Sequence, residues 1–311
     1  MRLSRRWLAR GRLRRPAAIE AAALGVLVVA SCGLTGTASS RGGGKVEVVA
    51  AENFWGSIAS QLGGDHAHVV SIITNPATDP HAYEVKPDDA RTIAHARYVI
   101  ENGAGYDAWA PKLINANPVS GRVVLNIGET LGKKEGDNPH MWYSPDYVNQ
   151  VIDRISSDYQ KLDAADSRYF DQQATAYKAI GLKGYTDTIA AIRRKYSGVP
   201  VGATESIFAY LAPALGLNLI TPPEYMKAIS EGTDPSAADK STIDDQIAGK
   251  KIKMFVFNSQ NTTPDVNAFI DKARVKGIAV TAVTETLTPA TATFQEWQTA
   301  QLKALLRALG G

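Results

Sequence analysis

Short β-branched runs and longer amphipathic stretches alternate along most of the chain. Four apolar runs fall between residues 45 and 128, and each precedes a stretch with helical periodicity. The same alternation resumes after residue 198 and again comprises four pairs. Strands that alternate with helices are typical of a parallel sheet covered by helices. The pattern therefore predicts two α/β lobes, residues 45–164 and 198–311.

The segment between the two lobes has a different pattern. Residues 165–197 contain no strand signal and no proline, which predicts one long helix of about 28 residues, roughly 40 Å at 1.5 Å per residue. Gly181 and Gly184 weaken this prediction, because glycine is a poor helix former. We expect an α/β fold of two lobes, each a mostly parallel sheet flanked by helices, joined by one long backbone helix. Ligands of open α/β sheets bind beyond the carboxyl ends of the strands, so a site would lie in the cleft between the lobes.

The first 44 residues are typical of an exported protein. An Arg-rich start, MRLSRRWLARGRLRR, leads into an apolar run, AAALGVLVVAS, that is too short to span a bilayer. The run ends in V-A-S-C-G, which resembles a bacterial lipobox, and this resemblance implies cleavage before Cys32 and lipidation of its sulfur. A chance cysteine in a signal peptide is the alternative. We expect a signal peptide at 1–31 and a flexible Gly-rich tether at 32–44. SRRWLAR also weakly resembles a twin-arginine export signal.

The charge and the cysteine count exclude several classes of protein. Residues 1–31 hold seven Arg and one acid, Glu20, so removing them changes the formal charge from +3 to −3. A nearly neutral chain without a basic stripe argues against a nucleic-acid partner. Cys32 is the only cysteine. The mature domain therefore has no intrachain disulfide, thiolate metal site or cysteine nucleophile.

Two histidines share one local motif. His81 in DPHAY and His140 in NPHMW both follow a proline, precede an aromatic by two positions, and lie in strand-to-helix connections. Proline fixes its own φ and favours an extended preceding residue, so the approach to each imidazole is rigid. Either histidine alone is more typical of capping or packing, but the repetition indicates a pair of metal ligands. We expect His66, His68 and His95 to be structural.

The second lobe has no histidine, so a shared site would need carboxylates from it. Glu205 directly follows VPVGAT, and Glu285 follows IAVTAV in the sequence TET. Each ends a predicted strand, as His81 and His140 do. The residues alone leave a second interpretation open for each acid: Glu205 as a favourable acid in the first turn of a helix that Thr204 caps, and Glu285 as a solvated loop acid.

The chain resembles the solute-binding lipoproteins of the zinc/manganese class of ABC importers. The matching segments are DPHAYEVKPDDA, NPHMW, ATESIFAYLAPALGL, DPSAAD, and TETL followed by TFQEWQTAQLKAL. The resemblance covers residues 46–309 and implies two lobes on a helical backbone with one interlobe metal site. It implies four ligands, which correspond here to His81, His140, Glu205 and Glu285. It also implies an extracytoplasmic monomer that is anchored to the membrane through Cys32 and delivers Mn²⁺ or Zn²⁺ to an ABC permease and its ATPase.

Two departures bear on the metal. Zinc-importing members typically have a histidine at the position of Glu205 and often a His-rich loop, whereas the connection GETLGKKEGDN is short and lacks histidine. Oxygen ligands suit manganese, which favours Mn²⁺, although the Irving–Williams order gives Zn²⁺ the tighter equilibrium binding. Glu285 stands where the family often has aspartate, and its extra methylene changes the reach of the fourth ligand.

Two other functions remain as alternatives. A binding protein for an organic solute or a metal chelate such as a siderophore would use a cleft lined by aromatic or arginine side chains. Trp55, Tyr83, Trp109 and Trp142 are candidates for such a lining, although packing in the core or around the site explains them better. A metallo-hydrolase would need an open coordination position and a general base, and no H-E-x-x-H motif occurs. We therefore expect a binding protein rather than an enzyme. An adhesin role is not addressed by the sequence.

Overall fold

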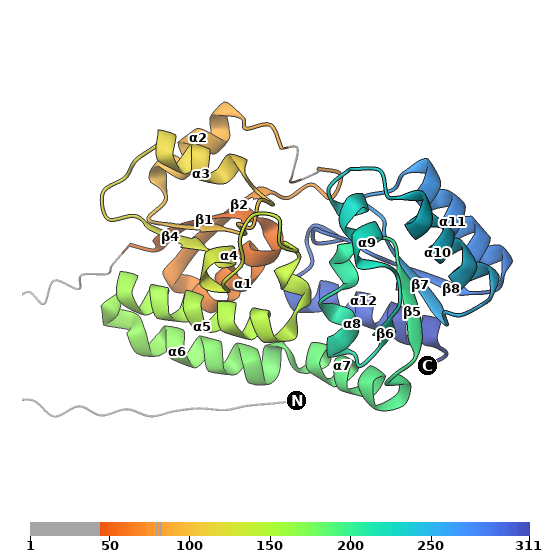
Figure 1. The fold of residues 1–311 in the computed structure, drawn as a ribbon. Helices are drawn as coiled ribbons and strands as arrows, with labels where there is room; N and C mark the ends of the chain where they lie inside the picture. The colour runs from red at the N-terminus through yellow and green to blue at the C-terminus, as the bar shows by residue number, and fades with distance from the viewer. Residues whose placement is uncertain (1–43, 79, 81–82) are drawn as a thin grey trace, which may run out of the picture. The chain divides into compact units, whose positions relative to one another are not determined.

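Two parallel four-stranded sheets form the framework of the chain (Figure 1). The structure is a computed structural model that describes residues 44–78, 80 and 83–311. Cys32 and the predicted signal peptide lie outside the described residues. The two sheets with flanking helices confirm the predicted α/β class.

The first lobe, here the N-lobe, carries the sheet of order β2-β1-β3-β4. Adjacent strands are parallel, with Val48 opposite Val69 in β2 and opposite Tyr98 in β3. Its elements are β1 (Val46–Glu52), α1 (Asn53–Gly63), β2 (Ala67–Ile73), α2 (Pro87–His95), β3 (Tyr98–Glu101), α3 (Trp109–Ala116), β4 (Val123–Asn126), α4 (Ile127–Thr130) and α5 (Pro145–Leu162).

Helices cover both faces of this sheet, which explains the continuous apolar run of β1. Val48 and Ala50 belong to the core on the side of α1 and α5. Val49 and Ala51 point the other way, into a smaller cluster shared with α2 and α3. Successive side chains of a strand alternate between faces, so a strand buried on both faces has no polar alternation.

The second lobe, the C-lobe, repeats the topology with the order β6-β5-β7-β8. Relative to their order in the chain, the strands of both sheets follow the pattern second, first, third, fourth. The elements of the C-lobe are β5 (Pro200–Ala203), α8 (Leu211–Ala214), β6 (Asn218–Leu219), α9 (Pro223–Ser230), α10 (Ala237–Ala248), β7 (Met254–Asn258), α11 (Pro264–Val275), β8 (Ala279–Val283) and α12 (Phe294–Leu309).

Three elements of the C-lobe differ from the sequence pattern. The edge strand β6 has two residues, because Pro222 lacks an N–H and the side chain of Thr221 replaces the ladder by accepting from the Ala203 N–H at 2.9 Å. The stretch after β5 forms a 3₁₀ turn (Ser206–Phe208) and the single-turn α8, which contains Pro213. Helix α9 was not predicted.

The helix predicted between the lobes is present but interrupted. It comprises α6 (Ser167–Ala176), a π-helical turn (Tyr177–Gly181) and α7 (Lys183–Tyr196). A Cβ at Gly181 would lie 2.6 Å from Cδ2 of Tyr177. The ring of Tyr177 therefore occupies the space beside Gly181, and its hydroxyl donates to Gln295 Oε1 at 3.0 Å. Gly181 permits this packing, and the extra residue per turn of a π-bulge accompanies it.

The two lobes share one hydrophobic core. A single buried cluster includes Trp55 and Ile155 of the N-lobe and Phe255 and Trp297 of the C-lobe. The start of α12 also contacts α1, since Ser57 Oγ accepts from the Phe294 N–H at 2.9 Å. The side chains of Gln61 and Gln295 exchange hydrogen bonds at 3.0 and 2.6 Å. The lobes are therefore joined at α12 as well as through the linking helix. Within the described residues, no helix is long and apolar enough to cross a membrane.

Substitution of the two glycines of the linking helix by alanine should have opposite effects. Gly181→Ala should destabilise the protein by about 1–3 kcal/mol, because its Cβ overpacks against the buried ring of Tyr177. Gly184→Ala is the matched control: its Cβ meets only Thr299 at 3.8 Å, so it should stabilise by up to about 1 kcal/mol. Urea unfolding of both variants measures the difference. Equal effects would show that the packing against Tyr177 does not constrain residue 181.

Candidate metal centre

Three predicted ligands from three separate connections converge in the structure. His140 precedes a 3₁₀ turn (Met141–Tyr143) in the connection between α4 and α5, Glu205 follows β5, and Glu285 follows β8. Their ligand atoms all lie within 4.8 Å of one another, and His140 Nε2 is 3.9 Å from Glu205 Oε1. All three side chains are buried. An imidazole nitrogen and two carboxylates in this arrangement can hold a divalent cation.

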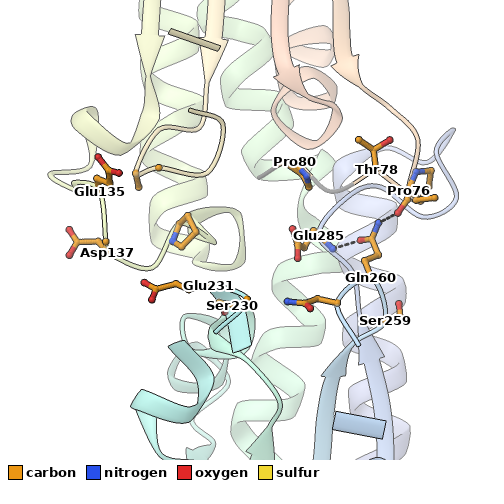
Figure 2. A pocket seen from close by; sticks show the side chains of 17 residues that line it. Pro76, Thr78, Pro80, Glu135, Asp137, Ser230, Glu231, Ser259, Gln260 and Glu285 are labelled. Atoms are coloured by element: carbon orange, nitrogen blue, oxygen red, sulfur yellow. Dashed lines mark hydrogen bonds between the residues drawn. The ribbon is translucent and has the colours of Figure 1, made fainter. Parts of the chain in front are cut away.

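The fourth predicted ligand, His81, lies outside the described residues. Its described neighbours Thr78 and Pro80 line the same cavity as Glu285, as Figure 2 shows. This places the connection after β2 at the cavity, at the carboxyl edge of the first sheet. The role of His81 stays a prediction.

A cavity of about 900 Å³ lies between the connections of the two lobes. In Figure 2, Pro76, Thr78 and Pro80 come from the N-lobe, and Ser230, Glu231 and Gln260 come from the C-lobe. The described lining residues include no tryptophan, tyrosine, phenylalanine or arginine. Trp55 and Trp142 are fully buried in the core, and Tyr83 packs against Trp109 at 5.0 Å between ring centroids.

The imidazole of His140 is oriented by Asn138. Asn138 Oδ1 accepts from the His140 backbone N–H at 3.1 Å and lies 2.8 Å from Nδ1. This contact assigns the proton to Nδ1 and makes Nε2 the nitrogen that can ligate an ion. Asn138 itself is held from the other lobe, because its Nδ2 donates to the Ser206 carbonyl at 2.7 Å. Trp142 packs edge-on to the imidazole at 5.2 Å.

Neutral donors hold both carboxylates. Asn258 ends β7, and its Nδ2 donates to Glu205 Oε1 at 2.9 Å and to Glu285 Oε1 at 2.6 Å. Asn261 Nδ2 donates to Glu205 Oε2 at 2.8 Å, and the Tyr106 hydroxyl donates to Glu285 Oε2 at 2.9 Å. The interpretations of Glu205 as a first-turn helix acid and of Glu285 as a solvated loop acid are wrong. The backbone of Glu205 is extended, and this residue precedes a 3₁₀ turn. The side chains of Glu205 and Glu285 are both buried.

Gln260 connects the C-lobe site to the N-lobe. Its Oε1 accepts from the backbone N–H groups of Glu285 and Thr286, at 2.5 and 3.1 Å. Its Nε2 donates to the carbonyl of Pro76, in the connection that leads toward residue 81 (Figure 2). One side chain therefore fixes the backbone at Glu285 and contacts the connection after β2.

Sequence reasoning missed these supporting residues. No role was predicted for Asn258, Asn138 or Tyr106. The available signal was positional: Asn258 ends a strand just as the four predicted ligands do, so the same edge argument applies to it.

A buried acid pair lies beside the site in the N-lobe. Glu52, the last residue of β1, is 0% exposed, and burial raises its pKa well above the usual 4.5. The negative charge of neighbouring Asp107 raises the pKa of Glu52 further. Asp107 accepts the backbone N–H groups of Asn102 and Gly103 at 2.6 and 2.8 Å, so Glu52 is the protonated partner. Burial also raises the pKa of nearby Glu101 to about 7.

A second group of potential ligand atoms occurs away from the cavity. His66, Asp163 and Asp166 bring one atom each within 4.8 Å, and His66 Nδ1 lies 3.1 Å from Asp166 Oδ2. The ring of His66 packs against Tyr169 at 4.2 Å. His68 pairs with Glu47 at 2.7 Å. Both histidines are explained by these pairs.

Comparison with known families shows which family the chain belongs to. Residues 48–308 match the family model described as "Zinc-uptake complex component A periplasmic" (ZnuA). The chain belongs to this family. Its members are extracytoplasmic metal-binding components of zinc and manganese ABC uptake systems, and they are binding proteins rather than enzymes.

Individual relatives agree with this assignment. The manganese-binding lipoprotein MntA of Bacillus subtilis (strain 168) is 25% identical over 262 residues, which cover 80% of this chain and 82% of that protein. The manganese ABC transporter substrate-binding lipoprotein PsaA of Streptococcus mitis is 24% identical over 264 residues, covering 78% and 81%. The Mn-bound periplasmic metal binding protein from Candidatus Liberibacter asiaticus superimposes with a TM-score of 0.70 at 18% identity, covering 84% and 98%, which shows a common fold.

Glu52→Gln should make stability less dependent on pH. The unfolded chain ionises Glu52 near pH 4.5, whereas the folded protein keeps it protonated to a much higher pH, so wild-type stability falls as pH rises above 4.5. Glutamine keeps a neutral side chain of nearly the same shape beside Asp107. We expect the variant to melt above wild type at pH 8 and to match it near pH 4. Glu224→Gln, at an exposed position, is the control and should change neither value. An equal gain at both pH values would contradict a protonated Glu52.

Proposed function

We propose that this protein captures Mn²⁺ outside the cytoplasm and delivers it to an ABC permease driven by a cytoplasmic ATPase. The observation that carries the proposal is the buried convergence of His140, Glu205 and Glu285 between the lobes. His81 completes the set in this proposal, giving two imidazole nitrogens and two carboxylates. The relatives named as manganese-binding lipoproteins support the same cargo.

The charges of the four proposed ligands favour binding of a divalent cation. Two buried carboxylates are costly to desolvate, and a dication bound between them offsets that cost. Neutral histidines then add ligands without adding negative charge. Binding requires deprotonated ligands, so affinity should decline toward acid pH.

Manganese is favoured over zinc by composition of the site and not by intrinsic affinity. Carboxylate oxygens suit Mn²⁺, while Zn²⁺ binds more tightly to most nitrogen and oxygen sites. Preference for Mn²⁺ then depends on geometry and on the supply of each metal. Zn²⁺ is the alternative cargo, and an organic solute or a metal chelate is the alternative ligand class.

Membrane attachment is the second part of the proposal. Cys32 follows a lipobox-like sequence, and the relatives above are named lipoproteins. Two or more acyl chains at Cys32 would anchor the protein stably. The Gly-rich residues 33–44 would then separate the binding domain from the membrane. We expect the domain to act as a monomer.

The first test removes one carboxylate. We expect one equivalent of Mn²⁺ or Zn²⁺ to raise the melting temperature of the metal-stripped domain lacking residues 1–32. At 100 times the Kd, bound ligand adds about 2.7 kcal/mol of stability. Glu205→Ala should lose most of this gain, because it removes a buried ligand. Glu224→Ala, an exposed acid of the same lobe, should keep it.

Metal content of the protein purified from a mixed Mn²⁺ and Zn²⁺ medium identifies the cargo that is retained. If neither ion shifts the melting temperature of the wild-type domain, the metal proposal fails and an organic solute becomes the leading candidate. An unchanged metal response in Glu205→Ala would remove Glu205 from the ligand set.

Ion binding should cause only a small movement of the lobes. The shared core and the contacts between α1 and α12 oppose wide opening. We expect the radius of gyration from small-angle X-ray scattering to differ by less than about 1 Å between metal-free and Mn²⁺-loaded protein, against about 19 Å expected for a folded chain of this size. A compaction of several ångströms would contradict this expectation.

A further inference from the structure

All four carboxylate oxygens of Glu205 and Glu285 accept a hydrogen bond from a neutral group. The donors, here called the donor set, are Asn258, Asn261 and Tyr106. Asn258 contributes twice, since one Nδ2 donates to both acids. A carboxylate held at both oxygens cannot rotate freely, so the planes of both groups are set before an ion arrives.

The position of Asn258 follows from the strand order. β7 lies between β5 and β8 in the second sheet, and Asn258 is its last residue. Glu205 and Glu285 follow the two flanking strands. The amide of the middle strand is therefore centred between the acids, and it is 0% exposed. An –NH₂ group has two hydrogens, which match two acceptors.

The chemistry of the donors leaves the acids able to ligate. Each carboxylate oxygen has two lone pairs, so accepting one N–H or O–H does not prevent a contact with a cation. Amide and hydroxyl donors add no positive charge that would compete with the ion. Both oxygens of each acid can then be presented as ligands in a fixed plane.

We propose that Asn258, assisted by Asn261 and Tyr106, is the positioning residue that sets the choice between metals at this site. By holding both carboxylate planes, the donor set presents more oxygen ligands to one ion than two freely rotating glutamates would. This inference rests on the proposed function, and it identifies which residues produce the preference for Mn²⁺.

The two metals should respond differently to loss of the donor set. Zn²⁺ is satisfied by four tetrahedral ligands, which two imidazoles and one oxygen from each acid can supply. Mn²⁺ binds nitrogen and oxygen sites more weakly and prefers oxygen, so it depends more on the number of oxygens within reach. Carboxylates that are free to rotate would each present one oxygen to the ion. That number of oxygens is enough for Zn²⁺ but too few for Mn²⁺.

The test measures Kd values for Mn²⁺ and Zn²⁺ by competition with a chelator, in wild type and in three variants: Asn258→Ala, Asn261→Ala and Tyr106→Phe. For Asn258→Ala we expect Mn²⁺ affinity to fall about 10- to 100-fold, the usual range for loss of a group that orients a metal ligand. Zn²⁺ affinity should fall at least about fivefold less. Asn261→Ala and Tyr106→Phe should shift the ratio in the same direction by a smaller factor.

The control is Gln246→Ala. Gln246 is a buried amide of the same lobe whose Nε2 donates to the Ile220 carbonyl at 2.7 Å, away from the acids. It should leave the ratio of the two affinities at the wild-type value, even if it lowers stability. Tyr106→Phe keeps the ring and removes one donor, so it tests the proposal even if Asn258→Ala fails to fold.

The electron paramagnetic resonance spectrum of bound Mn²⁺ supplies a readout that stability alone does not move. A change of coordination in Asn258→Ala should broaden or split the six-line spectrum, whereas Gln246→Ala should reproduce the wild-type spectrum. Equal losses for both metals, or an unchanged spectrum, would overturn the role of the donor set while the metal-binding function stands. Absence of metal binding by wild type would instead overturn the proposed function.

Discussion

Two buried carboxylates placed side by side impose the main constraint on this molecule. Glu205 and Glu285 are 1% and 6% exposed, and both accept hydrogen bonds from a single amide group. Ionised carboxylates without a counter-charge are costly in a dry interior. Neutral amide and hydroxyl groups donate to all four of their oxygens and orient the acids without cancelling their charge. A divalent cation bound between the two acids would offset this desolvation cost.

The duplicated topology explains how distant residues reach this one point. Both sheets have the same strand order, and the connections at their carboxyl edges line one cavity. Each lobe contributes a different chemistry: the described N-lobe ligand candidate is an imidazole, and the C-lobe provides the carboxylates. Contacts between the lobes beside the ligands, such as Asn138 to Ser206 and Tyr106 to Glu285, join the two halves. The site is thus an interface property that neither lobe has alone.

The two-lobe architecture could be predicted from local patterns of the sequence, whereas Glu205 and Glu285 were assigned as ligands through the family resemblance. β-branched runs identify strands, and a proline before a histidine identifies a rigid connection. The π-turn at Tyr177 could not be predicted, since it depends on packing against Gln295, 118 residues away. Asn258 was missed for a related reason. An asparagine at a strand end has no distinctive sequence pattern, and its contact with both acids depends on which strands flank β7. The part played by His81 still rests on the sequence motif.

The contact between α1 and α12 has a consequence for how such proteins can diversify. Helices α1 and α12, the first and last of the described residues, are packed together, so the C-lobe ends against the surface of the N-lobe. A recombination event that exchanged one lobe for that of a distant relative would replace only one side of this contact and of the shared core. The lobes look modular in topology, yet they must be inherited together. Change in cargo is then confined to substitutions at the carboxyl edges, where the two sheets meet.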